Sequence, residues 1–267
     1  MRFLRVYASY VWIFLRSRRI CRFTFYAGIF ANFYSYFVTY ALFWVIATRF
    51  GNIDGWGVED MTVLLGFNAL AYSVSGVLFS YAAYQLDNEI VSGNLDSYLV
   101  RPMGILQQMA CRSFVVDALI GPIFVTVVFM VVAFERISYQ ITAFNFIYLA
   151  AAVTSGILIQ SGAMIILGSL SFWSVHPQKI ASVVLTEMRA LTNLPLSIFP
   201  DFVRRGLTYA LPLALVNYYP SLMIMRKVET NEEFVIGLLS PLAGVCFFIF
   251  SIYVFSAGLR RYSSSGA

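Results

Sequence analysis

The run FTFYAGIFANFYSYFVTYALFWVIAT, residues 23–48, contains no charged side chain. A helix needs about 20 apolar residues to cross a hydrocarbon core about 30 Å thick, so this run predicts a membrane span. The composition agrees, because 60% of the 267 residues are hydrophobic and 12% are charged, whereas soluble domains carry about 25% charged residues. The mean hydropathy of +0.78 therefore favours an integral membrane protein over a soluble one.

Other long apolar stretches follow this first run. They cover residues 61–86, 113–134, 144–173, 180–199 and 234–258. With residues 23–48 they predict an all-α integral membrane protein with six transmembrane helices. The fourth stretch is rich in Gly, Ala and Ser, which permit close helix packing. The chain shows neither an internal repeat nor a linker, so we expect a single transmembrane domain over residues 1–267.

Two segments are predicted to lie against the membrane without crossing it. Residues 1–22 combine arginines with an apolar run, which predicts an amphipathic helix on the cytoplasmic surface. Residues 201–225 are apolar but contain Pro212 and Pro220. Because a full crossing there would invert the C-terminus, we expect a re-entrant helical hairpin on the outer side, between spans five and six.

The distribution of basic residues predicts the orientation. With six spans, eleven Lys and Arg residues fall on the side of the two termini and six fall on the opposite side. Cytoplasmic segments carry the excess of Lys and Arg in membrane proteins. We therefore expect both termini in the cytoplasm.

Several function classes are disfavoured. The three cysteines are widely spaced and His176 is the single histidine, so neither a disulfide framework nor a metal site is expected. Neither lysine follows a glycine, so the chain has no G-x-x-x-x-G-K-[ST] phosphate loop and is not expected to bind ATP in that way. Most arginines flank apolar segments, which explains the net charge of +5 without nucleic-acid binding.

Three ionisable residues lie within predicted spans. Asp117 follows Arg112 closely and should reach the cytoplasmic interface, whereas Glu187 and Arg189 lie deeper. A charge at the centre of a bilayer costs at least about 2.5–3.5 kcal/mol, so each should have a partner or face water. Glu187 and Arg189 point about 200° apart on a helix and need different partners. Structural pairing and a role in a transport path both remain open.

The segment 87–112 is predicted to be a loop with short helices, and QLDNEIVSGNLDSYLVRP, residues 85–102, is its most informative part. Gly93 reads as the residue that ends a helix, and Asp96 or Ser97 as the cap of a short following helix that Pro102 helps to end. Exposed apolar side chains beside Glu89 and Arg101 would make this turn a docking site, and a solvated connector is the alternative. The expected apolar anchors are Leu95, Tyr98 and Leu99.

The stretch GNLDSYLVRP, residues 93–102, resembles the G-x-L-D-x-x-L-x-R-P loop of bacterial ATP-binding-cassette (ABC) exporter permeases of the second type. Residues 194–200 and 211–220 resemble the outer-side region after the fifth span of that family. The candidate site residues in these two stretches are Pro195, Pro200, Pro212, Asn217, Tyr219 and Pro220. The density of Phe and Tyr in residues 23–48 departs from many members of the family.

The resemblance implies half of a transporter in a bacterial plasma membrane. Two copies, or this chain and a homologous permease, would pair there, each bound to a cytosolic ATPase that holds ATP and Mg²⁺. The ATPase would contact the loop after the second span through residues of the turn. These residues are Glu89, Gly93, Leu95, Asp96, Tyr98, Leu99, Arg101 and Pro102.

The function expected from this resemblance is the membrane-spanning subunit of an exporter of amphipathic or hydrophobic compounds, without an enzymatic step of its own. One alternative is an ion-coupled secondary transporter that uses Asp117, Glu187 and Arg189. The other is an integral membrane enzyme that modifies lipids, which the single histidine disfavours.

Overall fold

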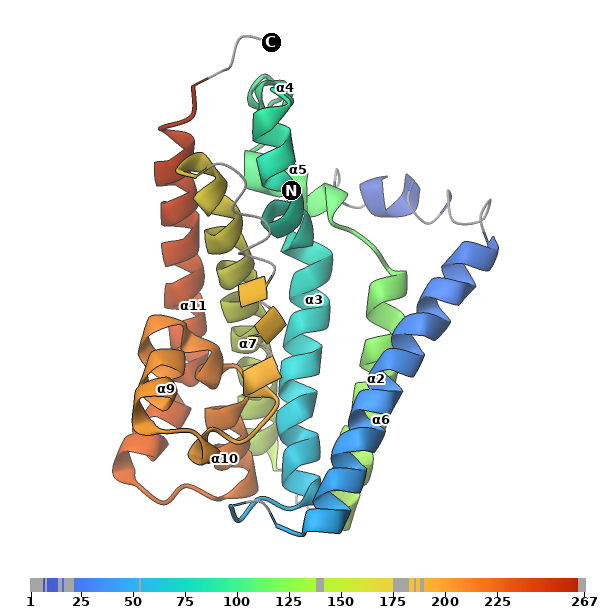
Figure 1. Ribbon diagram of the computed structural model, residues 1–267, viewed down its shortest axis with the longest axis vertical. Helices are drawn as coiled ribbons and strands as arrows, with labels where there is room; N and C mark the ends of the chain where they lie inside the picture. The colour runs from blue at the N-terminus through green and yellow to red at the C-terminus, as the bar shows by residue number, and fades with distance from the viewer. Residues whose placement is uncertain are drawn as a thin grey trace.

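The computed structural model describes residues 7, 9–13, 16, 22–52, 54–137, 142–174, 183–184, 186–187 and 190–263. Within these ranges the chain forms helices and no strand, which confirms the all-α class (Figure 1). Among the described residues, five helices are long and apolar enough to cross a membrane, so the chain is a multi-pass membrane protein. They are α2 (Arg22–Phe50), α3 (Val58–Val91), α6 (Asp117–Arg136), α7 (Ala143–Ser169) and α11 (Asn231–Leu259).

The boundaries of α3 differ from the prediction in a way that matters for the site. The helix runs five residues beyond the predicted end of its span and comprises 34 residues, which corresponds to about 51 Å at 1.5 Å per residue. That length exceeds the thickness of a hydrocarbon core by several turns. Part of α3 therefore extends beyond the hydrocarbon core, and its last turn leads into the short helices α4 (Leu95–Leu99) and α5 (Ile105–Arg112) at the end of the bundle (Figure 1).

The predicted fifth span, 180–199, is described in part. Residues 183–184, 186–187 and 190–192 are helical, and a 3-10 turn follows at Leu196–Ile198. Figure 1 shows these pieces descending beside α3 and α7. Asn68 of α3 donates hydrogen bonds to Thr192 and Asn193, so the end of this segment packs at the level of the middle of α3.

Contacts between distant residues define the two ends of the bundle. Near one end, the Tyr262 hydroxyl after α11 lies 3.0 Å from Asp96 of α4, and the ring of Tyr7 lies 5.8 Å from that of Phe114. Near the opposite end, Lys227 donates to the carbonyl oxygen of Gly55, in the turn that connects α2 and α3, at 2.6 Å. We call the first end the α4 end and the second the Gly55 end.

The N-terminal residues 7, 9–13 and 16 are helical where they are described. Figure 1 shows this helical turn lying across the direction of α2 rather than along it. Trp12 and Ile13 are each 59% exposed, and the Arg16 guanidinium lies 5.2 Å from the Trp12 ring. This arrangement fits the amphipathic surface helix that the sequence predicts.

The region 201–225 lies at the Gly55 end, where Lys227 also pairs with Asp60 of α3. It is a chain of short helical segments rather than the two helices of a simple hairpin. The segments are α9 (Asp201–Arg205), a π-helix (Gly206–Ala210), a 3-10 turn (Pro212–Leu215) and α10 (Tyr218–Met225). The 3-10 turn and α10 pack on α7 and α11, so these two segments belong to the core, whereas α9 has no buried residue.

The prolines of this region stand where helices begin. Pro195 and Pro200 precede the 3-10 turn 196–198 and α9, and Pro212 is the first residue of its own turn. Pro220 lies in the first turn of α10, where its missing N–H leaves no helical hydrogen bond unmade. The prolines therefore set the points at which the chain changes direction.

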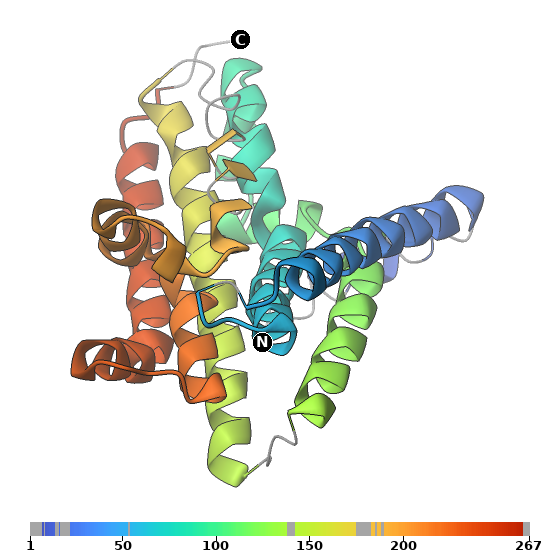
Figure 2. The same cartoon turned by 60° about the horizontal axis from the view of Figure 1, so that its bottom comes forward.

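Small residues bring the long helices together, as the composition of 144–173 predicts. An added Cβ at Gly168 of α7 would overlap the carbonyl oxygen of Ala82 in α3. A Cβ at Gly121 of α6 would lie 2.6 Å from the backbone nitrogen of Phe33 in α2. The helices α3, α7 and α11 form one packed group, and α2 with α6 forms a second group beside α3 (Figure 2).

Candidate functional site

The turn between α3 and α4 is built around Gly93. Its φ of +73° lies in the left-handed region, which glycine adopts at little cost and which strains a β-branched residue. Ser92 ends α3, and the Gly93 amide donates to the Ile90 carbonyl at 3.1 Å. The predicted role of Gly93 as the residue after a helix end is thereby confirmed. The chain reverses there and places α4 at the tip of the bundle (Figure 1).

The capping prediction is wrong. Helix α4 begins at Leu95, so its N-cap is Asn94, and no side chain makes a capping hydrogen bond there. The Asp96 carboxylate instead accepts a hydrogen bond from the Tyr262 hydroxyl. Pro102 lies in the bend that follows Val100, which is the C-cap of α4. The short helix is held by tertiary contacts rather than by its own cap.

The prediction that Leu95 and Tyr98 are exposed anchors is also wrong. Leu95 is 0% exposed and Tyr98 is 1% exposed. Both pack in an apolar cluster with residues of α3, α5, α7 and α11. These two side chains therefore fix α4 to the rest of the chain and are not available to a partner protein.

Glu89 is part of the same attachment rather than a charged contact at the rim. Its carboxylate lies 3.3 Å from Arg112 at the end of α5, and its side chain is 10% exposed. The Arg112 guanidinium lies 4.6 Å from the centre of the Tyr98 ring. One cation thus connects the last turn of α3, helix α4 and helix α5 through an ion pair and a cation–π contact.

Two further hydrogen-bonding groups fix α4 from opposite directions. The Gln108 amide donates to the carbonyl oxygens of Tyr98 at 2.9 Å and of Met103 at 2.8 Å. The Tyr262 hydroxyl donates to Asp96, and burial together with this hydrogen bond raises the pKa of Tyr262. The hydrogen bond to Asp96 links α4 to the residues that follow α11.

The outward side of the turn is apolar and exposed. Leu99 is 50% exposed, Val100 is 84% exposed and Val91 is 58% exposed. Arg101 is exposed beside them. The charged residues Glu89 and Arg101 on either side of this stretch favour its position in water rather than in the hydrocarbon core.

The structure describes two of the three predicted intramembrane charges. Asp117 begins α6, and its carboxylate faces Gly28 of α2, where an added Cβ would lie 2.6 Å from Oδ2. Glu187 is exposed on the surface of the chain. Arg189 lies outside the described residues.

A buried polar network in the membrane region was missed by the sequence analysis. Asn68 of α3 accepts a hydrogen bond from Gln160 of α7 at 3.4 Å and donates to Asn193 at 2.6 Å. Asn217 donates to the carbonyl oxygen of Thr192. Side-chain amides in the middle of apolar runs are rare in membrane helices, so Asn68 and Gln160 are the signal that could have revealed this network.

Asn217 and Tyr219, which were predicted from the resemblance, act locally in this region. The Asn217 side chain accepts from the Tyr218 amide at 2.9 Å and caps α10. The Tyr219 hydroxyl lies 3.3 Å from the hydroxyl of Thr208. Both side chains hold the short helices at the Gly55 end in place.

A groove of half polar character lies beside the network, between α2, α3 and the described part of 186–193. Its volume is about 280 Å³, and Tyr36, Tyr40, Tyr72, Thr186 and Asn193 are among its lining residues. Helix α2 is poorly covered by the rest of the chain. In its most apolar stretch 6% of residues are buried, compared with 67% in α3.

No group of three or more His, Cys, Asp or Glu residues that could hold a metal ion occurs among the described residues. The arrangement can bind apolar and hydrogen-bonding groups and can transmit force from α4 to three long helices.

Comparison with known proteins identifies the family. Residues 33–266 match the model of a family described as ABC-2 family transporter protein. Nothing matched in comparisons with curated proteins or with solved structures. This family is a membrane component of ABC transporters, and membership implies partnership with an ABC ATPase subunit. Because the match includes the long helices and the α4 turn, the chain belongs to the ABC-2 family of transporter proteins.

Proposed function

We propose that the chain is the permease subunit of an ABC exporter, in which a separate ATPase drives the outward movement of an amphipathic or hydrophobic substrate. The observation that carries this proposal is the construction of α4. Its inward residues, Leu95 and Tyr98, are fully buried, whereas Leu99 and Val100 form an apolar edge in water. A fixed helix with an exposed apolar edge is suited to dock into a groove of another protein.

The attachments of α4 support a mechanical role. Arg112 and Gln108 connect it to α5, Glu89 belongs to α3, and Tyr262 follows α11. A displacement of α4 by the ATPase would therefore move the ends of α3, α5 and α11 as one body. ATP and Mg²⁺ would be bound by the ATPase, and this chain would supply two helix packings whose relative stability the ATPase changes.

The arrangement of the α4 end supports one orientation of the chain. The N-terminal helical turn, α4 and Tyr262, which follows α11, all lie at this end. The excess of basic residues supports a cytoplasmic position for this end, in a bacterial inner membrane. Single cysteines at Ser263 and Asn231 should be labelled from opposite sides by a membrane-impermeant maleimide, and labelling of both from outside would contradict this orientation.

The exposed surface of α2 supports a second permease, either another copy or a homologous chain. The groove of half polar character is open on this side, and Glu187 in the adjoining segment is exposed. A carboxylate at this depth needs water or a partner. If two permeases pair across α2 and the segment 186–193, Glu187 would face the partner permease or water between the two chains. The two permeases would then enclose a path for the substrate.

Reconstitution tests the proposed function. We expect an ABC ATPase to co-purify in a fixed ratio with the tagged chain from its native membrane. We also expect the complex in lipid vesicles to move an amphipathic dye only when ATP is hydrolysed. Transport that is driven by a proton gradient without nucleotide would contradict the proposal and favour an ion-coupled carrier.

A further inference from the structure

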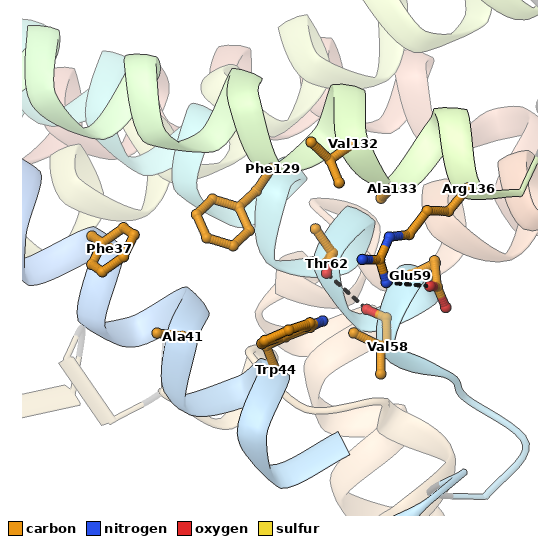
Figure 3. Close-up of a pocket in the computed structure, with 10 residues that line it drawn as sticks. All are labelled: Phe37, Ala41, Trp44, Val58, Glu59, Thr62, Phe129, Val132, Ala133 and Arg136. Carbon is orange, nitrogen blue, oxygen red and sulfur yellow. Dashed lines mark hydrogen bonds and ion pairs between the residues drawn. The ribbon is translucent and has the colours of Figure 1, made fainter. Parts of the chain in front are cut away.

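A second groove lies on another face of α2, between that helix, the start of α3 and the end of α6 (Figure 3). Its volume is about 310 Å³. Its walls are mainly apolar and include Phe37, Ala41 and Trp44 of α2 with Phe129 and Val132 of α6. The distance from Phe37 to Trp44 along the helix is about 10 Å, which suits part of one extended chain rather than a bulky molecule.

The sequence explains why a space remains here. Phe33 of α2 and Gly121 of α6 bring the two helices into close contact in the half of α6 near its start. In the other half, Ala41 of α2 and Ala133 of α6 are the two smallest residues that line the groove, and larger side chains surround them (Figure 3). Two small residues between aromatic walls leave an apolar volume that the protein does not fill.

The groove opens toward the bilayer. Phe37 and Trp44 are each 45% exposed, and Val132 is 44% exposed. All three lie on helices that are apolar and long enough to span the membrane. On average, the residues of α2 that line this groove point about 140° away from the four α2 residues that line the groove of half polar character, Ser35, Tyr36, Thr39 and Tyr40. The surroundings of the second groove are therefore lipid rather than a paired permease.

A cation lies at the mouth of the groove. Arg136 is the last residue of α6, its Nη1 lies 3.6 Å from Oε1 of Glu59, and its side chain is 54% exposed. Its guanidinium also lies 6.0 Å from the centre of the Trp44 ring. A guanidinium has five N–H donors in a geometry that matches phosphate, and the ion pair with Glu59 involves one of the nitrogens of a side chain that remains 54% exposed.

We propose that this groove binds one acyl chain of a membrane phospholipid, with the phosphate of the same lipid held by Arg136. The acyl chain complements the apolar walls, and the anionic phosphate complements the cation at the mouth. Arg136 lies at the end of its span, which is the depth of a phosphate group when the acyl chain lies in the hydrocarbon core. This inference uses neither an ATPase nor a transported compound, so it stands or fails apart from the proposed function.

Photocrosslinking of a defined lipid tests the site. The full chain is placed in vesicles of phosphatidylethanolamine and phosphatidylglycerol that contain a phosphatidylethanolamine with a diazirine on one acyl chain. We expect crosslinks at Phe129 and Val132 to exceed those at Leu42, which is 53% exposed on α2 but does not line the groove. Equal yields at all three residues would mean bulk lipid only and would overturn the proposal.

Two variants locate the acyl chain within the groove. Ala41→Trp fills the groove from α2 and should remove the excess crosslinking at Phe129. Leu42→Trp adds the same ring at the neighbouring exposed position and should leave that excess unchanged. Crosslinking at Phe129 that survives Ala41→Trp in a folded protein would contradict the assignment.

Arg136→Gln tests the phosphate contact without filling any space. A lost hydrogen-bonded contact to a charged group corresponds to about a tenfold weaker retention of phospholipid during delipidation. Arg205→Gln is the matched control, because Arg205 is exposed in α9 and does not line the groove. Equal retention in wild type and Arg136→Gln, measured by mass spectrometry, would overturn the role of Arg136.

Discussion

Helices α4 and α10 are both short and both pack near an end of the long helices, yet they differ in what they leave exposed. In α10 most side chains are buried, including Tyr218, Tyr219 and Leu222. In α4 two side chains are buried, but Leu99 at its end is 50% exposed and Val100 after it is 84% exposed. Helix α10 is thus buried in the core, whereas one side of α4 is not covered by the rest of the chain.

The largest loss of stability is expected from substitutions on the buried side of α4, which is the side that resembles α10. Leu95→Ala and Tyr98→Ala each leave a cavity in a packed apolar cluster and should lower the free energy of unfolding by about 2–5 kcal/mol. Thermal unfolding in detergent measures the loss. Leu99→Ala, on the exposed side, should cost no more than about 0.5 kcal/mol. Equal losses for Leu95→Ala and Leu99→Ala would remove the distinction between the two sides.

Ion pairs at the two ends give the next comparison. Glu89 pairs with Arg112 beside α4, and Asp60 pairs with Lys227 beside α10, with acidic side chains that are 10% and 13% exposed. Removing either carboxylate breaks an ion pair of a cation that is about one-third exposed and should cost about 1–2 kcal/mol. Glu89→Ala should also weaken binding of the ATPase, since α4 loses orientation. If Asp60→Ala weakens binding of the ATPase as much as Glu89→Ala does, the effect of Glu89→Ala is due to general destabilisation of the chain.

The smallest effect is expected for single hydroxyl groups. Tyr262→Phe removes the hydrogen bond to Asp96, and Tyr219→Phe removes the contact with Thr208. Each should cost about 0.5–1.5 kcal/mol of stability. In reconstituted complexes Tyr262→Phe should lower the transport obtained per ATP hydrolysed, whereas Tyr219→Phe should not. An unchanged amount of transport per ATP hydrolysed in Tyr262→Phe would show that this hydrogen bond does not couple the movement of α4 to α11.

The amino-acid sequence predicts the long helices well, because charge-free runs of sufficient length have few alternatives in a membrane. It also predicts the turn at Gly93, since a left-handed residue after a helix has a strong preference for glycine. It does not reveal which side of α4 faces inward. Leu95, Tyr98 and Leu99 share one face by spacing, but the surfaces that cover two of them come from α5, α7 and α11.

The hydrogen-bond partners within the buried polar network could not be predicted from the sequence either. Asn68 and Gln160 can be recognised as unusual within apolar runs, but their partners Thr192 and Asn193 lie in a segment interrupted by charges and proline. Pairing between such distant positions depends on how α3 and α7 pack, and Gly168 controls that packing. Local patterns carry no information about this arrangement.

The central claim is that the exposed side of α4 docks the ATPase. The most direct test is the affinity of the purified ATPase for the double variant Leu99→Asp/Val100→Asp, with Ile137→Asp as control. Ile137 is 38% exposed at the end of α6 that lies away from α4. Loss of central apolar contacts costs about 2 kcal/mol or more, so we expect binding to weaken by at least about 30-fold, with unchanged thermal unfolding and normal binding by the control. Wild-type affinity in the folded double variant would contradict the account.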